Sequence, residues 1–255
     1  MTLSPHLAEL VFAVGAGDLL IGVSAYTDYP DDAVNLPVVG DAFNLDQEQL
    51  AVLAPNLLLS WDSGTPAHVV DELRSRGYRV EVISTTSLED LPDALLRIGV
   101  LTGREGTASA IADQFTKGLE DLMQAAKDAE SIRVFYQVHA HPLYTINGDH
   151  FLSQVIELCG GTNIFADLNG LAPLVSVESV LEREPELILA SSDAGPGAFD
   201  EWMRWSDMAA IRYSNQFLMP ANEIGRATPR LLIGATAVCG ALQKGRENRK
   251  RYLND

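Results

Sequence analysis

The sequence is poor in positive charge. Its 255 residues include 18 Lys and Arg against 35 Asp and Glu, which gives a formal net charge of −17 at pH 7. A phosphate backbone or an anionic membrane surface has to be met by clustered positive charge. We therefore expect neither a nucleic-acid-binding protein nor one that docks electrostatically on lipid. The 47% content of hydrophobic residues predicts a folded globular chain.

Long hydrophobic runs are also lacking. The apolar stretches 10–14, 50–54 and 187–190 are far shorter than the roughly 20 residues that a membrane span requires. The first residues, Met1 to Pro5, show neither the charged nor the apolar region of a secretory signal. Either the protein is cytoplasmic or an export signal has been removed from the sequence.

Cysteine is scarce, and the common catalytic motifs are incomplete. Cys159 and Cys239 lie too far apart for a zinc ribbon or a Cys-x-x-Cys motif, and their spacing leaves buried thiols and a disulfide equally open. Gly15 and Gly17 are followed by Leu20 where a dinucleotide-binding fingerprint needs glycine. No P-loop, nucleophile elbow or His-Glu-x-x-His motif occurs. The absence of these motifs argues against an enzyme, although a nucleophile and a base could still come together from distant positions.

Short apolar runs alternate with amphipathic stretches along most of the chain. We predict strands at 19–23, 56–60, 80–83, 132–138, 187–191 and 217–219. We predict helices from Pro5 to about Gly15, at 46–54, 66–76, from Ser87, at 150–159, 176–183 and 198–206, and from Thr228. Such alternation is typical of parallel sheets in a layered α/β fold.

Residues 103–131 interrupt this alternation. Apolar residues recur at spacings of three and four from Ile111 to Met123, and no proline occurs from Arg104 onward in this stretch. The pattern predicts a single helix of about 25 residues, which is long for a globular protein. We expect this helix to join two α/β lobes, residues 1–102 and 132–255.

Aromatic and polar residues follow the ends of several predicted strands. The carboxyl ends of parallel strands face the ligand crevice, and aromatic side chains there make suitable walls for a flat, largely apolar ligand. We therefore predict a ligand-binding cleft at these strand ends. Its candidate residues are Tyr26, Asp28, Tyr29, Trp61, Asp62, Tyr144, Asn222 and Arg226.

His139 and His141 are candidates for a metal-ligand pair. They follow the strand 132–138 and would point to the same side of an extended chain. No third ligand stands at a matching spacing. We therefore favour two loop histidines and expect no metal site and no resident cofactor.

An ordered set of motifs spans almost the whole chain. The motifs are Thr2-Leu3-Ser4-Pro5 with Glu9-Leu10, Gly22-Val23-Ser24 before Tyr26-x-Asp28-Tyr29-Pro30, Ala54-Pro55-Asn56-Leu57, Glu157-x-Cys159-Gly160-Gly161-x-Asn163-Ile164-Phe165, Val175-Ser176-x-Glu178-x-Val180-Leu181 and Arg226-Ala227-x-Pro229-Arg230. In this order they resemble the cobalamin-binding periplasmic proteins of bacterial ABC importers. That family belongs to the helix-linked, class III substrate-binding proteins, which also serve siderophores and haem.

The resemblance implies a fold and a transport role. It implies two Rossmann-like α/β lobes joined by one long helix, with the ligand cleft between the lobes. The protein would be an extracytoplasmic monomer whose signal has been removed. It would capture a corrinoid of the cobalamin (vitamin B12) type and deliver it to the permease dimer of an ABC importer.

The resemblance also implies roles for individual residues. Tyr26 and Trp61 match aromatics that flank the corrin, and Tyr144 matches an aromatic of the second lobe. Arg226 matches a basic cleft residue, and Asn222 stands where an aspartate is usual. Cys159 and Cys239 match two half-cystines and so are expected to form a disulfide. Glu48 and Glu178 match acidic residues that dock into arginine pockets of the permease; each also lies near a helix start, where a carboxylate has a capping role.

Two departures from the family pattern affect the ligand more than the fold. The family has tryptophans near position 42 and before Pro173, where this sequence has Ala42 and Ala172. A ferric siderophore or haem is therefore the alternative ligand. A cytoplasmic metallocluster protein on the same scaffold is a further alternative, and it would need free cysteine thiolates.

Overall fold

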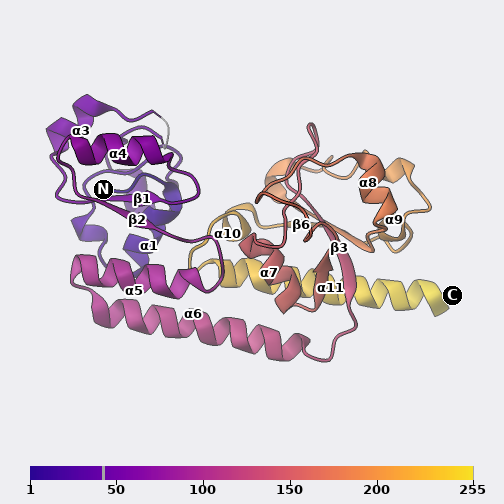
Figure 1. The fold of residues 1–255 in the computed structure, drawn as a ribbon. Coiled ribbons are helices and arrows are strands. Elements are labelled where there is room, and N and C mark those ends of the chain that lie inside the picture. The colour runs from indigo at the N-terminus through magenta and orange to yellow at the C-terminus, as the bar shows by residue number, and fades with distance from the viewer. Residues whose placement is uncertain (42–43, 255) are drawn as a thin grey trace. The chain divides into compact units, whose positions relative to one another are not determined.

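The chain folds into two compact units. The computed structural model describes residues 1–41 and 44–254 (Figure 1). Unit 1 comprises residues 1–116 together with 227–229, and unit 2 comprises the remaining residues, 117–226 and from Arg230 onward. Helix α6 (Glu105–Ala126) runs from one unit into the other. The division into lobes of residues 1–102 and 132–255 stays a prediction.

Parallel strand pairing organises unit 1. Strand β1 (Leu58–Trp61) pairs in parallel with β2 (Val80–Ile83). On the other side of β1, Thr2 forms a parallel bridge with Leu59 and donates its backbone N–H to Gly22. The strand predicted at 19–23 is wrong, because residues Gly17–Leu19 form a 3-10 turn and Val23 alone makes a bridge, with Val38. Leu19 and Ile21 are exposed, so this apolar run is not a buried strand.

Local sequence signals place the helices of unit 1. Ser4 is the N-cap residue of α1 and Pro5 its first residue, as predicted, and Asp46 caps α3 by accepting a hydrogen bond from the Gln49 N–H at 2.9 Å. Ala54, in the left-handed conformation, ends α3. The helices are α1 (Pro5–Ala13), α2 (Asp31–Val34), α3 (Gln47–Leu53), α4 (Ala67–Ser75) and α5 (Asp90–Thr102).

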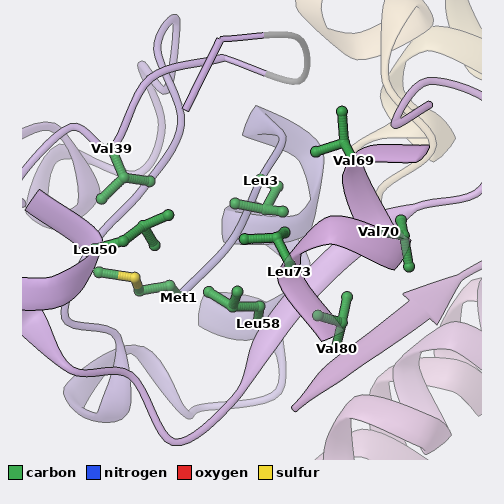
Figure 2. Close-up of a cluster of buried hydrophobic side chains, with 9 residues drawn as sticks. All are labelled: Met1, Leu3, Val39, Leu50, Leu58, Val69, Val70, Leu73 and Val80. Carbon is green, nitrogen blue, oxygen red and sulfur yellow. The ribbon is translucent and has the colours of Figure 1, made fainter. Parts of the chain in front are cut away.

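A cluster of buried aliphatic side chains lies between β1, β2, α3 and α4 (Figure 2). Leu58 comes from β1, Leu50 from α3 and Leu73 from α4, and each is at most 1% exposed. Burying one such side chain stabilises a fold by roughly 1.5–3 kcal/mol. The cluster therefore holds β1 firmly and, with it, the residues at its carboxyl end. Its members are Met1, Leu3, Val39, Leu50, Leu58, Val69, Val70, Leu73 and Val80.

Unit 2 contains a four-stranded parallel sheet of order β4-β3-β5-β6. Its strands are β3 (Ile132–Gln137), β4 (Gly161–Asn163), β5 (Leu187–Ser191) and β6 (Gln216–Met219). Its helices are α7 (Phe151–Leu158), α8 (Val177–Glu182), α9 (Ala209–Arg212), α10 (Ala221–Gly225) and α11 (Leu231–Asn254), all labelled in Figure 1. The two units together confirm the predicted α/β class with parallel sheets.

Four expectations for the helices need correction. The helix predicted at 198–206 is wrong: the segment contains only a 3-10 turn at Trp202–Arg204, because the Trp202 indole is buried and donates to Gln137 at 2.6 Å. The long linking helix has 22 residues, not about 25. The helices predicted from Ser87 and Thr228 begin at Asp90 and Leu231, each three residues later than expected. No helix among the described residues is both long and apolar enough to cross a membrane.

Candidate functional site

The predicted ligand residues of unit 1 follow two extended segments. β1 ends at Trp61, and the extended segment through Val23 leads into the 24–29 loop. β1 runs parallel to the segment at Thr2, whose backbone N–H donates to the Gly22 carbonyl oxygen at 3.2 Å. Trp61 and Asp62 lie at the carboxyl edge of the β1–β2 sheet, and Tyr26, Asp28 and Tyr29 lie in the loop after Val23.

The two aromatic residues proposed to face the ligand are held differently. Tyr26 has a left-handed backbone with φ 65° and is 83% exposed. Trp61 is half-buried, and the His6 ring contacts it edge-on with ring centroids 4.9 Å apart. The Trp61 backbone N–H donates to the Thr65 hydroxyl at 3.2 Å. The Trp61 indole is therefore packed against the His6 ring, whereas the Tyr26 side chain is exposed to solvent.

The turn after β2 lies at the same edge and is stabilised by Asp90. Its carboxylate accepts hydrogen bonds from the Thr86 N–H at 2.9 Å, the Thr86 hydroxyl at 2.8 Å, the Ser87 N–H at 2.9 Å and the Ser84 hydroxyl at 3.1 Å. Burial would raise the pKa of Asp90, but these hydrogen bonds outweigh burial and lower the pKa below its ordinary value. The ionised carboxylate fixes the turn.

Unit 2 carries the other predicted ligand residues at the carboxyl edge of its sheet. Tyr144 is half-buried in a short extended segment that forms bridges with His139 and Leu174. Helix α10 starts two residues after β6, so Asn222 lies in its first turn and Arg226 directly follows its last residue. The fold thus brings Tyr144, Asn222 and Arg226 to the carboxyl ends of strands in one sheet.

Alanine stands at both positions where the family pattern has tryptophan, Ala42 and Ala172. Ala172 is exposed and precedes Pro173, whose carbonyl oxygen accepts the Thr145 N–H at 3.1 Å. It therefore lies in the segment next to Tyr144. Ala42 lies outside the described residues.

Two polar residues directly after β5, Ser192 and Asp193, were not among the predicted site residues. Ser192 accepts a hydrogen bond from the Ala221 N–H at 3.2 Å, which ties the end of β5 to the start of α10. Burial and the nearby Asp193 carboxylate raise the pKa of Tyr136, on β3. Ser192 and Asp193 follow a correctly predicted strand, so the rule that singled out the other strand ends could have found them.

Glu48 and Glu178 occupy equivalent positions on different helices. Each is exposed and lies in the first turn, Glu48 in α3 and Glu178 in α8. Ser176 and Ser179 form a capping box at the start of α8. Hydrogen bonds from its own backbone N–H and from the Ser176 hydroxyl lower the pKa of Glu178. Both carboxylates are therefore favoured by the helix dipole and accessible to a partner.

The two loop histidines have separate protein contacts. His139 Nδ1 lies 3.0 Å from the Pro142 carbonyl oxygen, and His141 Nε2 lies 3.5 Å from a Glu201 carboxylate oxygen. Within residues 1–41 and 44–254, no group of three His, Cys, Asp or Glu side chains is placed to hold a metal ion.

Cys159 and Cys239 form a disulfide, which confirms the pairing implied by the resemblance. Their Cα atoms are 4.9 Å apart. The bond joins the end of α7, just before β4, to α11 and so cross-links two elements of unit 2.

Two cavities lie away from the predicted ligand residues. A polar cavity of about 380 Å³ in unit 2 is lined by Arg133, Trp205 and Arg212 among others, near the amino ends of β3 and β5. An apolar cavity of about 320 Å³ in unit 1 is lined by Val11, Leu20 and other aliphatic residues. Neither contains a residue that the sequence assigned to the ligand.

Comparison with known proteins gives consistent matches along the chain. A family model for periplasmic binding proteins matches residues 1–223. The vitamin B12-binding protein of Vibrio cholerae serotype O1 is 32% identical over 244 residues, which cover 95% of this chain and 88% of the relative.

Solved structures share the fold. The crystal structure of the periplasmic vitamin B12 binding protein BtuF of Vibrio cholerae has a TM-score of 0.87 and 31% identity, and the match covers 96% of each chain. A possible iron-binding, periplasmic solute-binding protein from Staphylococcus epidermidis has a TM-score of 0.83 and 25% identity, with 95% of this chain and 97% of that chain covered.

Proposed function

Because the chain belongs to the periplasmic binding protein family, we propose that it captures a corrinoid such as cobalamin outside the cytoplasm and delivers it to an ABC importer. The observation that carries the proposal is that aromatic residues follow two extended segments of unit 1, Tyr26 after Val23 and Trp61 at the end of β1, in a chain that is 32% identical to a vitamin B12-binding protein. A corrin ring is broad and largely apolar, and aromatic faces desolvate such a ring. The role is binding, without a chemical step.

Polar side chains would complete recognition of the corrinoid. Asp28 and Asn222 can exchange hydrogen bonds with the amide groups around the ring, and Arg226 can pair with a phosphate. Tyr144 offers a further aromatic surface. Tyr29 and Asp62 lie beside these groups in the sequence and form the rest of the proposed contact set.

Charge favours a neutral ligand over an anionic one. Asp28 and Asp62 are the charged members of the proposed set on unit 1, and Arg226 is its one cation. An anionic ferric siderophore or the propionates of haem would meet like charge at the unit 1 edge. These ligands are the second candidates because the Staphylococcus epidermidis relative is described as possibly iron-binding.

Glu48 and Glu178 are proposed to dock the loaded protein on the permease. Both are exposed carboxylates in first helical turns, which suits pairing with arginine side chains of a partner. The metallocluster alternative is disfavoured, since both cysteines are joined in the disulfide and offer no thiolate.

A co-elution experiment tests the choice of ligand. Purified protein is mixed with cyanocobalamin, haemin or a ferric catecholate siderophore and passed over a gel-filtration column, which also reports whether the protein is a monomer. We expect the red corrinoid to elute with the protein and the two anionic ligands to elute separately. Co-elution of haem or siderophore without the corrinoid would contradict corrinoid binding and identify the co-eluting compound as the ligand.

A further inference from the structure

We propose that His6 is a positioning residue for Trp61, holding the indole in the orientation that meets the ligand. The importance of that orientation rests on the function proposed above. The positioning itself rests on contacts within unit 1. None of the motifs considered in the sequence assigned a role to His6.

The ring of His6 contacts the indole directly. His6 is the second residue of α1 and is 7% exposed. Its ring lies edge-on to the Trp61 indole, with centroids 4.9 Å apart and an interplanar angle of 79°. A T-shaped contact depends on the mutual angle of the two rings, so a fixed histidine favours one orientation of the tryptophan.

Two hydroxyl groups from separate elements fix the histidine. Ser4 Oγ lies 3.1 Å from His6 Nδ1, and Thr85 Oγ1, after β2, lies 3.4 Å from His6 Nε2. Ser4 occupies the N-cap position of α1, yet its side chain makes no capping hydrogen bond. A serine in that position ordinarily caps the helix. Here its hydroxyl contacts His6 instead, which is a departure from local helix chemistry of the kind expected at functional sites.

Gly64 also packs against the indole. A Cβ atom at this glycine would lie 2.0 Å from Cε3 and 2.2 Å from Cζ3 of Trp61, so the 61–65 turn passes against the ring. In the part of the chain that the structure describes, the buried Trp61 Nε1 has no hydrogen-bond acceptor. The indole is therefore oriented by packing against His6 and Gly64 and not by a hydrogen bond of its own.

The test measures indole order and ligand affinity separately. Protein labelled with 5-fluorotryptophan contains three fluorinated indoles, and the Trp61 signal is assigned with Trp61→Phe. His6→Leu should broaden or shift the Trp61 ¹⁹F signal and weaken cyanocobalamin binding about tenfold, whereas His6→Phe should restore much of both. His68→Leu, at an exposed histidine of α4, is the matched control and should change neither.

The outcomes separate this inference from the proposed function. An unchanged Trp61 signal in His6→Leu overturns the positioning role. A disturbed signal with unchanged cyanocobalamin affinity supports positioning of the indole but removes Trp61 from the ligand site. If His6→Leu fails to fold, Gly64→Ala provides the second variant, because its new methyl group must displace the indole. An undisturbed Trp61 signal in folded Gly64→Ala would also overturn the proposal that packing orients the indole.

Discussion

The guanidinium of Arg246 donates a hydrogen bond to the carbonyl oxygen of Cys159 at 2.8 Å. It also donates to the carbonyl oxygens of Gly160 at 3.0 Å and Glu130 at 2.6 Å. Cys159 is the C-cap residue of α7, where backbone carbonyls lack partners within the helix. Arg246 is 5% exposed, so one buried cation from α11 satisfies the end of α7 beside the disulfide.

We predict that Arg246→Met destabilises unit 2 by about 2–4 kcal/mol, because buried carbonyl oxygens lose charged donors. Arg251→Met, at an exposed residue near the end of the same helix, is the matched control and should change stability by less than about 0.5 kcal/mol. Urea denaturation followed by circular dichroism measures both. Equal stabilities for the two variants would show that the Arg246 hydrogen bonds contribute little.

The disulfide should stabilise the protein through the unfolded chain. Cys159 and Cys239 close a loop of 80 residues, which corresponds to roughly 4 kcal/mol in the chain-entropy model. Cys159→Ala/Cys239→Ala should therefore lower the urea midpoint of unfolding while leaving cyanocobalamin binding by the folded protein intact. A thiol assay on denatured wild-type protein should detect no free thiol. Two reactive thiols would contradict the disulfide.

Acid should destabilise unit 2 through His150. Its imidazole accepts the Leu152 N–H at 3.1 Å and caps α7, so Nδ1 must be unprotonated. Burial lowers the pKa of His150 from its ordinary 6.5 to about 4. As the pH falls from 6.5 toward 4, the unfolded chain binds a proton that the folded chain does not, and stability is lost.

His150→Asn tests this pH dependence, since asparagine can cap the helix but does not titrate. We predict that wild type loses about 1–2 kcal/mol more unfolding free energy than His150→Asn between pH 7 and pH 5. His68→Asn, at an exposed histidine, should retain the wild-type pH dependence. Parallel pH profiles for wild type and His150→Asn would rule out this histidine as the source.

Glu48→Gln/Glu178→Gln should abolish transport and spare ligand binding. The two carboxylates lie in first turns of separate helices, and neither belongs to the residues proposed to contact the ligand. Stability should fall by less than about 1 kcal/mol per site, the typical worth of a helix-dipole contact. Uptake of radiolabelled cobalamin through a reconstituted permease gives the readout. Glu105→Gln, in the first turn of α6, is the control; loss of affinity in the double variant would contradict a docking role.

Elements governed by neighbouring residues could be predicted from the sequence. Strand Val80–Ile83 and strand Leu187–Ser191 match their predicted bounds, since each is a short apolar run with clear limits. The Asp46 cap of α3 depends on a residue three positions away. By contrast, the helix predicted at 198–206 fails because Trp202 is bound by Gln137, 65 positions earlier.

The residues of the candidate site also divide into those that neighbouring residues predict and those that depend on contacts with distant residues. Trp61 could be found because it directly follows a predicted strand. His6 could not, since its role depends on Thr85, 79 positions away, and on an edge-on contact with Trp61. The disulfide required the family resemblance, because the spacing of Cys159 and Cys239 alone left free thiols equally open.

Calorimetric titration of the purified protein with cyanocobalamin is the decisive test of corrinoid capture. We predict saturable 1:1 binding with a dissociation constant of about 1 μM or tighter, and Trp61→Ala should weaken it by about tenfold or more. Absence of binding by folded, disulfide-bonded protein would contradict corrinoid capture and leave a binding protein of the same family with a different ligand.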